Sequence, residues 1–283
     1  MTKLAWATDI HLDCISERPE VLVAFGESLV AKKPDAILIT GDISLAPSLI
    51  YHLSALERVV NRPVYFVLGN HDFYKGSVEQ VRKEMKDVSN MSQYLKYLPT
   101  TPYVALSPST ALVGHDGWYD AGYGDTKQTN FIMRDWMSIA EFVNGGAFDS
   151  PGMYGGQHSP NIGKIISIAK KLAHEGVTHV MDGIKKAVRY HKTIVIATHF
   201  PPFQESHIHE GRVGDAGAMP WYTSRMMGDM LRQAAGAYPK VRFEVFCGHT
   251  HGAFDGQIDQ NLYCHVGAAE YGKPRLQNII TVP

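Results

Sequence analysis

The amino-acid sequence predicts an α/β fold built around a parallel sheet, and two observations support this prediction. In the first 72 residues, short apolar runs typical of buried strands alternate with segments of helical periodicity. Each apolar run also ends in polar residues that could bind a metal or move a proton, as in residues 64–72, VYFVLGNHD. Open α/β sheets place their binding sites at the carboxyl ends of such strands, so a functional site is expected there.

The N-terminal part of the chain predicts three strands separated by two helices. Strands are expected over residues 4–8, 36–40 and 64–68, because each run is short and almost wholly apolar. One helix is expected over 19–33, between two prolines, and a second over about 49–60, where leucines recur at helical spacing. This alternation implies right-handed crossovers and therefore a parallel sheet.

The middle of the chain predicts a less regular region. A helix is expected over about 78–88 and could continue to Leu98, followed by a hairpin within residues 103–113. A further helix is expected over 131–143. Residues 144–160 contain five glycines and two prolines without periodicity, which is typical of a lid, a binding loop or a mobile segment.

The remaining elements again alternate between helices and strands. Gly176 is expected to interrupt a helical pattern that begins at Ile162 and continues to Val188. Further elements are expected in this order: a strand at 194–198, irregular chain at 203–222, a helix at 224–237, and strands at 241–247, 262–266 and 278–282. Since no repeat or linker separates them, a single domain over residues 1–283 is expected, with inserted loops at about 115–160 and 203–225.

Composition and charge narrow the range of partners. The formal net charge is -1, which gives no electrostatic argument for binding nucleic acid or an anionic membrane. No apolar run is long enough to span a bilayer, and Asp9 comes too early for the apolar core of a signal peptide. The three cysteines lack the spacing of disulfide frameworks or zinc sites. A cytoplasmic protein that binds neither membrane nor nucleic acid is therefore expected.

Five predicted strands end in side chains that could bind a metal ion. They are Asp9 and His11, Asp42, Asn70 with His71 and Asp72, His199, and His249 with His251. Imidazole nitrogens mixed with carboxylate and amide oxygens suit divalent Mn, Fe, Co, Ni or Zn better than Ca or Mg. The set is too large for one ion, and a shared carboxylate would let two ions lie about 3.5–4 Å apart. Such a pair clamps a phosphoryl oxygen and generates a hydroxide nucleophile at neutral pH.

These motifs resemble those of the calcineurin-like metallophosphoesterase superfamily. They occur in the family's order over residues 9–251: Asp9-x-His11, Gly41-Asp42, Gly69-Asn70-His71-Asp72, His199 after an apolar strand, and Gly248-His249-x-His251. The resemblance implies a four-layer α/β/β/α sandwich, in which two mixed sheets pack together with helices outside. It also implies a binuclear, metal-dependent phosphoric ester hydrolase.

The resemblance further implies a role for each site residue. Three sets of metal ligands are implied: Asp9, His11 and His251 for the first ion, Asn70, His199 and His249 for the second, and Asp42 bridging both. His71 would contact the phosphate and protonate the leaving group, and Asp72 would orient the His71 imidazole. Attack by a metal-bridging hydroxide would leave no phosphorylated protein residue.

The sequence defines the substrate less closely. Protein serine/threonine phosphatases of the superfamily carry an Asp-Arg-Gly extension and a Glu after Asn-His. Here Gly41-Asp42 continues as Ile43-Ser44-Leu45, and Asp72 takes the Glu position, which argues against that branch. The chain is more similar to the bacterial-type phosphohydrolases and phosphodiesterases. A small phosphomonoester or phosphodiester, for example a nucleotide, is expected, with substrate choice set by residues 115–160 and 203–225.

Other interpretations stay open at this point. The chain could be a catalytically silent scaffold for protein assembly or a nuclease, although intact ligand positions and the absence of net basic charge argue against them. Asp9 or Asp42 alone could merely cap a turn. Residues 115–119, with His115, Asp116, Trp118 and Tyr119, could line the pocket or form a surface or hinge loop. His207 and His209 could approach a substrate, although an exposed loop position is the simpler interpretation. Contact with a leaving group and a phosphate is one interpretation of Trp221, Tyr222 and Arg225, and a packed loop with a solvated arginine is the other.

Overall fold

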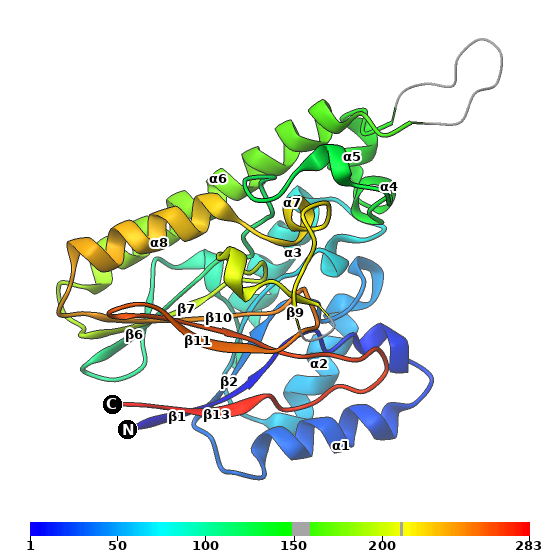
Figure 1. Ribbon diagram of the computed structural model, residues 1–283. Coiled ribbons are helices and arrows are strands. Elements are labelled where there is room, and N and C mark those ends of the chain that lie inside the picture. Colours follow the sequence, from blue (N-terminus) through cyan, green and yellow to red (C-terminus); the bar gives the residue numbers. More distant parts are fainter. Residues whose placement is uncertain (149–158, 210–211) are drawn as a thin grey trace.

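The computed structural model describes residues 1–148, 159–209 and 212–283, and its centre is a pair of stacked β-sheets (Figure 1). The first sheet has the strand order β13-β1-β2-β3-β4, with β1 to β4 parallel and β13 antiparallel to β1. Its strands are β1 Thr2–Ala7, β2 Ala36–Thr40, β3 Val64–Val67, β4 Leu95–Tyr97 and β13 Asn278–Val282.

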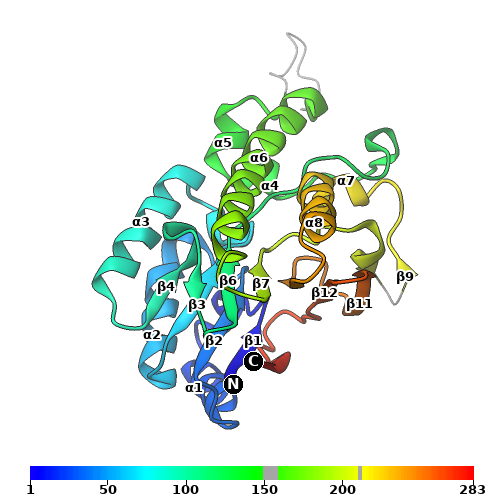
Figure 2. The ribbon, with the colours of Figure 1, turned by 90° about the vertical axis from the view of Figure 1, so that its left-hand side faces the viewer.

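Three helices cover the outer face of the first sheet (Figure 2). They are α1 Pro19–Val30, α2 Leu49–Val60 and α3 Val78–Met91. Alternate strand residues such as Ala5, Ile37 and Phe66 pack against these helices in one apolar core, because successive side chains of a strand point to opposite faces. The predicted strand and helix order of the N-terminal part is confirmed.

The second sheet has the strand order β11-β12-β10-β7-β6-β5, with a parallel centre and antiparallel edges. Its strands are β5 Val104–Ala105, β6 Thr110–Gly114, β7 Thr193–Ala197, β10 Arg242–Cys247, β11 Phe254–Asp259 and β12 Leu262–Val266. Helices α6 Ile162–Ala187 and α8 Arg225–Ala237 pack on its outer face. β11 was not predicted, because its sequence FDGQID forms no apolar run.

The inner faces of the two sheets meet in a second apolar layer. Trp6, Leu38 and Val67 of the first sheet pack there with Val195 and Phe246 of the second. The central strands are therefore buried on both faces, which explains their nearly continuous apolar sequences. The order of layers is helix, sheet, sheet, helix, and the predicted four-layer α/β/β/α sandwich of two mixed sheets is confirmed.

Two expected helices differ from the prediction in their extent: the first does not continue to Leu98, and the second is divided. α3 ends at Met91, and the chain then forms β4, because residues 95–97 pair in parallel with residues 64–66 at the edge of the first sheet. Residues 131–143 do not form one helix: the chain there contains α4 Asp135–Ser138 and α5 Ala140–Asn144. Ile139 between them is extended and forms a β-bridge to Gly76, which interrupts the helical path.

Gly176 does not interrupt α6, contrary to the prediction. A Cβ at this position would lie 3.0 Å from His115 Nδ1 and 3.1 Å from Gly117 Cα, tighter than ordinary side-chain contacts. Glycine therefore lets the helix approach the loop after β6 closely, and packing outweighs the weak helix propensity of the residue.

The segment after β7 is irregular, as expected, with β8 Ile208–His209 paired to β9 Arg212–Val213 and a short helix α7 Met219–Tyr222. The lid, binding-loop or mobile-segment interpretation of residues 144–160 falls mainly on residues 149–158, which lie outside the described residues. Within the described part of the chain, no helix combines the length and the apolar character that crossing a bilayer requires.

Candidate active site

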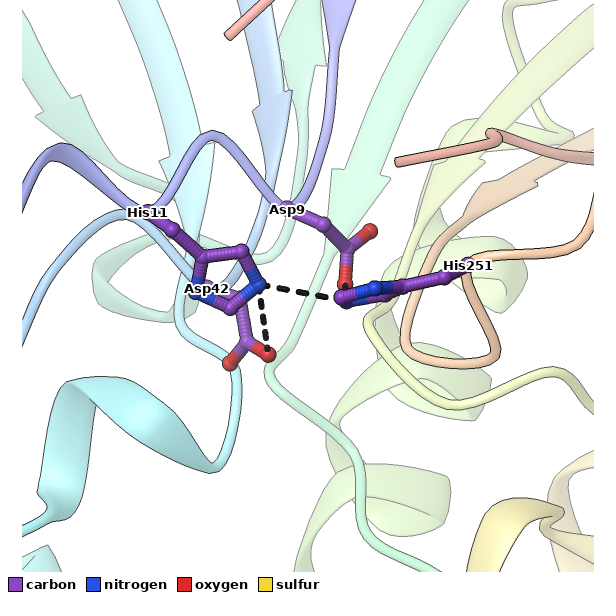
Figure 3. Close-up of side chains that lie close together, drawn as sticks. All are labelled: Asp9, His11, Asp42 and His251. Carbon is purple, nitrogen blue, oxygen red and sulfur yellow. Dashed lines mark hydrogen bonds and ion pairs between the residues drawn. The ribbon is translucent and has the colours of Figure 1, made fainter. Parts of the chain in front are cut away.

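The polar strand ends predicted from the sequence come together where β1, β2, β3, β7 and β10 end. Two groups of donor atoms form there: Asp9, His11, Asp42 and His251 in one, and Asp42, His199 and His249 in the other. Within each group the atoms lie within 4.8 Å of one another, and Asp42 belongs to both. Figure 3 shows the first group, with side chains from the ends of β1, β2 and β10 pointing toward one another.

The backbone of the site adopts unusual conformations. Five of its residues have φ between 40° and 70°: Asp9, His11, Asp42, His249 and His251. A residue with a Cβ adopts this region at a cost of about 1–3 kcal/mol, so the surroundings must hold it there. The N–H of Asp9 donates to the Gly41 carbonyl at 3.0 Å, and the N–H of His11 donates to the Asp42 carbonyl at 3.0 Å. The two neighbouring loops thus brace each other.

Two motif glycines allow the strand ends to come this close. A Cβ at Gly69 would overlap Asp42 Oδ1, and a Cβ at Gly248 would overlap Asp9 Oδ2. The absence of a side chain at both positions is therefore a steric requirement for bringing the two carboxylates to the site.

In the first group, imidazole nitrogens and carboxylate oxygens face one another across short gaps (Figure 3). His11 Nε2 lies 3.2 Å from His251 Nε2 and 3.9 Å from Asp42 Oδ2, and His251 Nε2 lies 3.5 Å from Asp9 Oδ1. Burial is the largest influence on His11 and lowers its pKa to about 4. His11 is therefore neutral at pH 7, which is the form of imidazole that binds a metal.

In the second group, hydrogen bonds leave ring nitrogens free to bind a cation. His199 Nδ1 bonds the Thr40 carbonyl at 2.9 Å, so Nε2 faces Asp42 Oδ1 at 3.4 Å and Asn70 Oδ1 at 3.2 Å. His249 Nε2 lies 3.4 Å from the Trp221 carbonyl, and its Nδ1 is buried without a hydrogen-bond partner in the described chain. An imidazole nitrogen in this position fits a metal ligand.

Asp42 makes the site attractive to cations. Burial favours a neutral His199, but the Asp42 carboxylate outweighs it and raises the pKa of His199 to about 10. Burial likewise opposes the charge on Asp42, yet His199 and His71 hold its pKa well below the usual range. The carboxylate that favours a proton on His199 would also attract a divalent cation. Imidazoles with carboxylates and no thiolate fit two divalent transition-metal ions.

Tyr74 and Asp135 orient Asn70, and sequence reasoning missed both. Asn70 Nδ2 donates to Asp135 Oδ1 at 2.8 Å and to the Tyr74 hydroxyl at 3.0 Å, and that hydroxyl donates to Asp135 Oδ1 at 2.6 Å. The amide nitrogen is thereby turned away and Asn70 Oδ1 is left facing His199. Asp135 is wholly buried on α4, far from any motif in the sequence, so no local pattern pointed to it.

His71 lies beside both donor groups without belonging to either. Its backbone N–H donates to Asp42 Oδ1 at 2.9 Å, and its Nε2 lies 4.0 Å from Asp42 Oδ2. The side chain is 15% exposed, against 2% for Asp42, and it packs against Tyr74 with ring centroids 4.4 Å apart. His71 is thus positioned to meet a ligand that contacts the carboxylate.

The structure corrects the role expected for Asp72. Its Oδ1 accepts the backbone N–H groups of Ile43 and Ser44 at 2.9 and 2.8 Å, and its Oδ2 accepts that of Gly69 at 2.8 Å. No hydrogen bond joins it to the His71 imidazole among the described residues. Asp72 therefore fixes the loop that carries Asp42, because its two oxygens are used by backbone donors.

Residues 115–119 are buried and do not line the cavity, so the pocket-lining and surface-loop interpretations are wrong. Asp116 is buried behind His199, and its carbonyl accepts the His199 backbone N–H at 3.1 Å. Its carboxylate accepts Leu68 N–H, Arg82 Nε and the Tyr97 hydroxyl at 2.7–2.9 Å. Trp118 and Tyr119 are wholly buried in the core. This segment supports the site from behind.

A cavity of about 590 Å³ opens over the donor atoms and is lined by Asp42, Asn70, His71, His249 and His251. We call its exposed lining residues, Ile132, Arg134, Asp215 and Tyr271, the cavity rim. The lining also includes residues 131–134, together with Asp215, Ala218 and Tyr222, which fall within the two segments expected to set substrate choice. Tyr271, which also lines the cavity, was not predicted.

The aromatic residues of the 203–225 segment divide between the cavity and other places. His207 and Tyr222 line the cavity with nearly parallel rings, 5.6 Å apart and 10° between planes, so packing alone does not describe them. Trp221 is buried, as packing predicts. Arg225 is exposed and pairs with Asp229 at 3.3 Å outside the cavity lining. The side chain of His209 lies outside the described part of the structure.

The sequence matches the model of the calcineurin-like phosphoesterase family over residues 2–253. The chain belongs to this family. Membership identifies it as a metal-dependent phosphoric ester hydrolase, in agreement with the two donor groups that share Asp42. No curated protein matches the sequence.

Solved structures with the same fold have little sequence identity to this family member. Phosphopantetheinyl hydrolase of Mycobacterium tuberculosis has a TM-score of 0.63 at 14% identity, covering 97% of this chain and 95% of its own. A dimetal phosphatase from Danio rerio has a TM-score of 0.56 at 12% identity, covering 94% of this chain and 87% of its own. GAP50 of Plasmodium, described as the anchor in the inner membrane complex, has a TM-score of 0.50 at 12% identity, covering 94% of this chain and 71% of its own. At these identities the likeness shows the fold alone.

Proposed function

We propose that this chain is a binuclear phosphoesterase that hydrolyses a small phosphomonoester or phosphodiester, with His71 as the general acid. The observation that carries the proposal is Asp42, which belongs to both donor groups at the base of the cavity. One carboxylate between two sets of ligands is the arrangement that a pair of metal ions requires.

The ligands are assigned as follows: Asp9, His11 and His251 to the first ion, Asn70, His199 and His249 to the second, and Asp42 to both. When bound, two such ions polarise a phosphoryl oxygen and lower the pKa of a water molecule to near neutrality. The identity of the metals, manganese among them, is left to measurement.

His71 is the residue best placed to move the proton. It lines the cavity beside Asp42, and its imidazole is more accessible than the Asp42 carboxylate. In the proposed reaction it donates a proton to the leaving oxygen as the bond from phosphorus breaks, which contributes about 10²–10⁴-fold. Tyr74 and His11 pack against the ring and limit its movement.

The cavity supports a small substrate. Its volume of about 590 Å³ is within the range of pockets that take small molecules, and its walls carry the aromatic rings of Tyr222, His207 and Tyr271. A nucleotide is one ester that these walls could accept, since planar bases stack on aromatic side chains. A cytoplasmic location and a single domain stay predictions.

The rival function is a scaffold on the same fold. GAP50 shows that a protein described as an anchor can share this fold. Against this reading, the donor atoms of the present chain form two groups that share Asp42, and burial keeps His11 in the neutral form of imidazole that binds a metal.

The deciding experiment measures turnover of p-nitrophenyl phosphate and bis-p-nitrophenyl phosphate after metal removal and addition of Mn, Co, Ni, Zn or Mg. We expect metal-dependent hydrolysis that Asp42→Asn abolishes, and the two esters distinguish monoesterase from diesterase activity. Metal content per chain is measured in parallel. Absence of hydrolysis together with near-zero metal binding would establish the scaffold instead.

A further inference from the structure

Arg134 is the only lysine or arginine that lines the cavity within the described residues. It belongs to the cavity rim and is exposed, whereas Asp42, Asn70 and His249 at the base are nearly inaccessible. A cation at the rim of the cavity faces the part of a bound substrate that projects away from the metal-binding residues at the base.

The guanidinium lies one aromatic ring away from His71. Arg134 Cζ is 5.1 Å from the centroid of the Tyr74 ring, and the centroid of the same ring lies 4.4 Å from that of His71. This cation–π contact holds the guanidinium on the His71 side of the cavity, which is where the leaving group of the proposed reaction would lie.

The backbone at Arg134 is anchored on both sides. Met133 and Asp135 are buried, and Asp135 is hydrogen-bonded to Asn70 and Tyr74. Asn70 belongs to the metal-ligand cluster, which we define as the seven proposed ligands Asp9, His11, Asp42, Asn70, His199, His249 and His251. Residues 133–135 therefore fix the Arg134 backbone relative to the site. Because this segment is already ordered, substrate binding costs little conformational entropy there.

The charge of Arg134 has no carboxylate partner in the described part of the chain. Other arginines do: Arg82 pairs with Asp116, Arg225 with Asp229, and Arg232 with Glu205. Asp215, the acidic residue of the cavity rim, uses Oδ1 to accept the N–H groups of Gly217 and Ala218 at 2.8 and 2.9 Å. An anion entering the cavity thus meets a guanidinium that no described carboxylate has neutralised.

We propose that Arg134 binds a second anionic group of the substrate, carried on the leaving group apart from the scissile phosphate. The substrate class is thereby narrowed to phosphate esters that bear an additional carboxylate or phosphate. The inference rests on the proposed hydrolase function, since it places the scissile phosphate at the metal ligands. A planar guanidinium suits both kinds of anion, because it can donate two parallel hydrogen bonds.

The test compares esters that differ only in the second anion: phenyl phosphate, carboxyphenyl phosphate and phenylene bisphosphate, followed by released inorganic phosphate. In the native enzyme kcat/KM is higher for one or both of the esters that carry a second anionic group than for phenyl phosphate, and the better of the two identifies the preferred anion. Arg134→Ala lowers the ratio of kcat/KM between that ester and phenyl phosphate about tenfold, mainly through KM. Arg134→Lys keeps the charge but not the planar guanidinium, so its ratio of kcat/KM lies between those of the native enzyme and Arg134→Ala.

Arg225→Ala is the matched control, because Arg225 is also an exposed arginine near a tyrosine ring, 5.9 Å from Tyr123, but does not line the cavity. It leaves the ratio unchanged. If Arg134→Ala lowers kcat/KM equally for all three esters, or not at all, the assignment of Arg134 is overturned, while the proposed hydrolase function stands. Absence of metal-dependent turnover of any ester by the native enzyme would overturn the hydrolase itself.

Discussion

The metal-ligand cluster and the cavity rim face each other across one cavity but are built differently. The cluster lies at the ends of core strands, with mostly buried side chains, several positive φ angles and carboxylates anchored by backbone N–H groups. The rim comes from inserted segments and a C-terminal loop, and its side chains are exposed. The contrast teaches that rigid strand ends can hold a reaction centre while peripheral segments select the substrate.

The largest effect is expected from Asp42→Asn, which removes the carboxylate common to both donor groups. Turnover should be abolished, because even residues that merely support a metal ligand cost about 10–100-fold when changed. Metal content by elemental analysis should fall with it. Asp229→Asn, an exposed carboxylate outside the cavity lining, serves as control. Normal metal content in Asp42→Asn would contradict the shared site.

His71→Ala should lower turnover by about 10²–10⁴-fold while metal content is retained, since His71 belongs to neither donor group. The loss should be larger for phenyl phosphate than for p-nitrophenyl phosphate, because a poor leaving group depends more on protonation. His174→Ala, an exposed histidine on α6, is the control. An equal loss on both esters would argue against a general acid.

Asp135→Ala should weaken one of the two metal sites by about 10–100-fold, because Asn70 loses the acceptor that orients it. Titration of the metal-depleted protein should show one weakened and one nearly native binding step. Asp135→Asn keeps one oxygen acceptor and should recover part of the affinity. Two equally weakened steps would indicate general damage to the fold instead.

In chelated protein, stability should fall as pH rises from 7 toward 10. The folded pKa of His199 is raised to about 10, above its ordinary value of 6.5, so the protonated form stabilises the fold below pH 6.5 and this contribution is lost as pH rises through 10. Thermal unfolding with and without added metal measures the effect. Because a bound cation replaces the proton, metal should flatten the pH dependence, and a steeper dependence would contradict ligation at His199.

The smallest effect is expected at the rim. Tyr271 is 54% exposed, and its ring centroid lies 4.4 Å from that of His11 and 5.0 Å from that of His251. Tyr271→Ala should raise KM a few-fold, since it removes roughly 0.5–1.5 kcal/mol of aromatic contact. Tyr190→Ala, an exposed tyrosine outside the cavity lining, is the control. A collapse of kcat would assign Tyr271 to the reaction centre and break the contrast between cluster and rim.

Several features were determined by the sequence alone, because they are local. Short apolar runs fixed the core strands, and the polar residues directly after them fixed which side chains the parallel sheets would bring together. Asp9, His11, Asp42, His199, His249 and His251 were all found this way, and the structure gathers them within two small groups. Their proposed roles in catalysis await measurement.

Only the tertiary structure decided the features that depend on distant contacts. Asp135 reaches Asn70 across 65 positions of sequence, and Tyr271 covers His11 from the other end of the chain. Gly176 lies within a helix because the loop after β6 packs closely against it. Asp72 accepts hydrogen bonds from backbone N–H groups that are not its neighbours in sequence, so motif spacing does not predict them. Sequence periodicity indicates which face of a helix or strand is buried, but it does not indicate which residues from distant parts of the chain pack against that face.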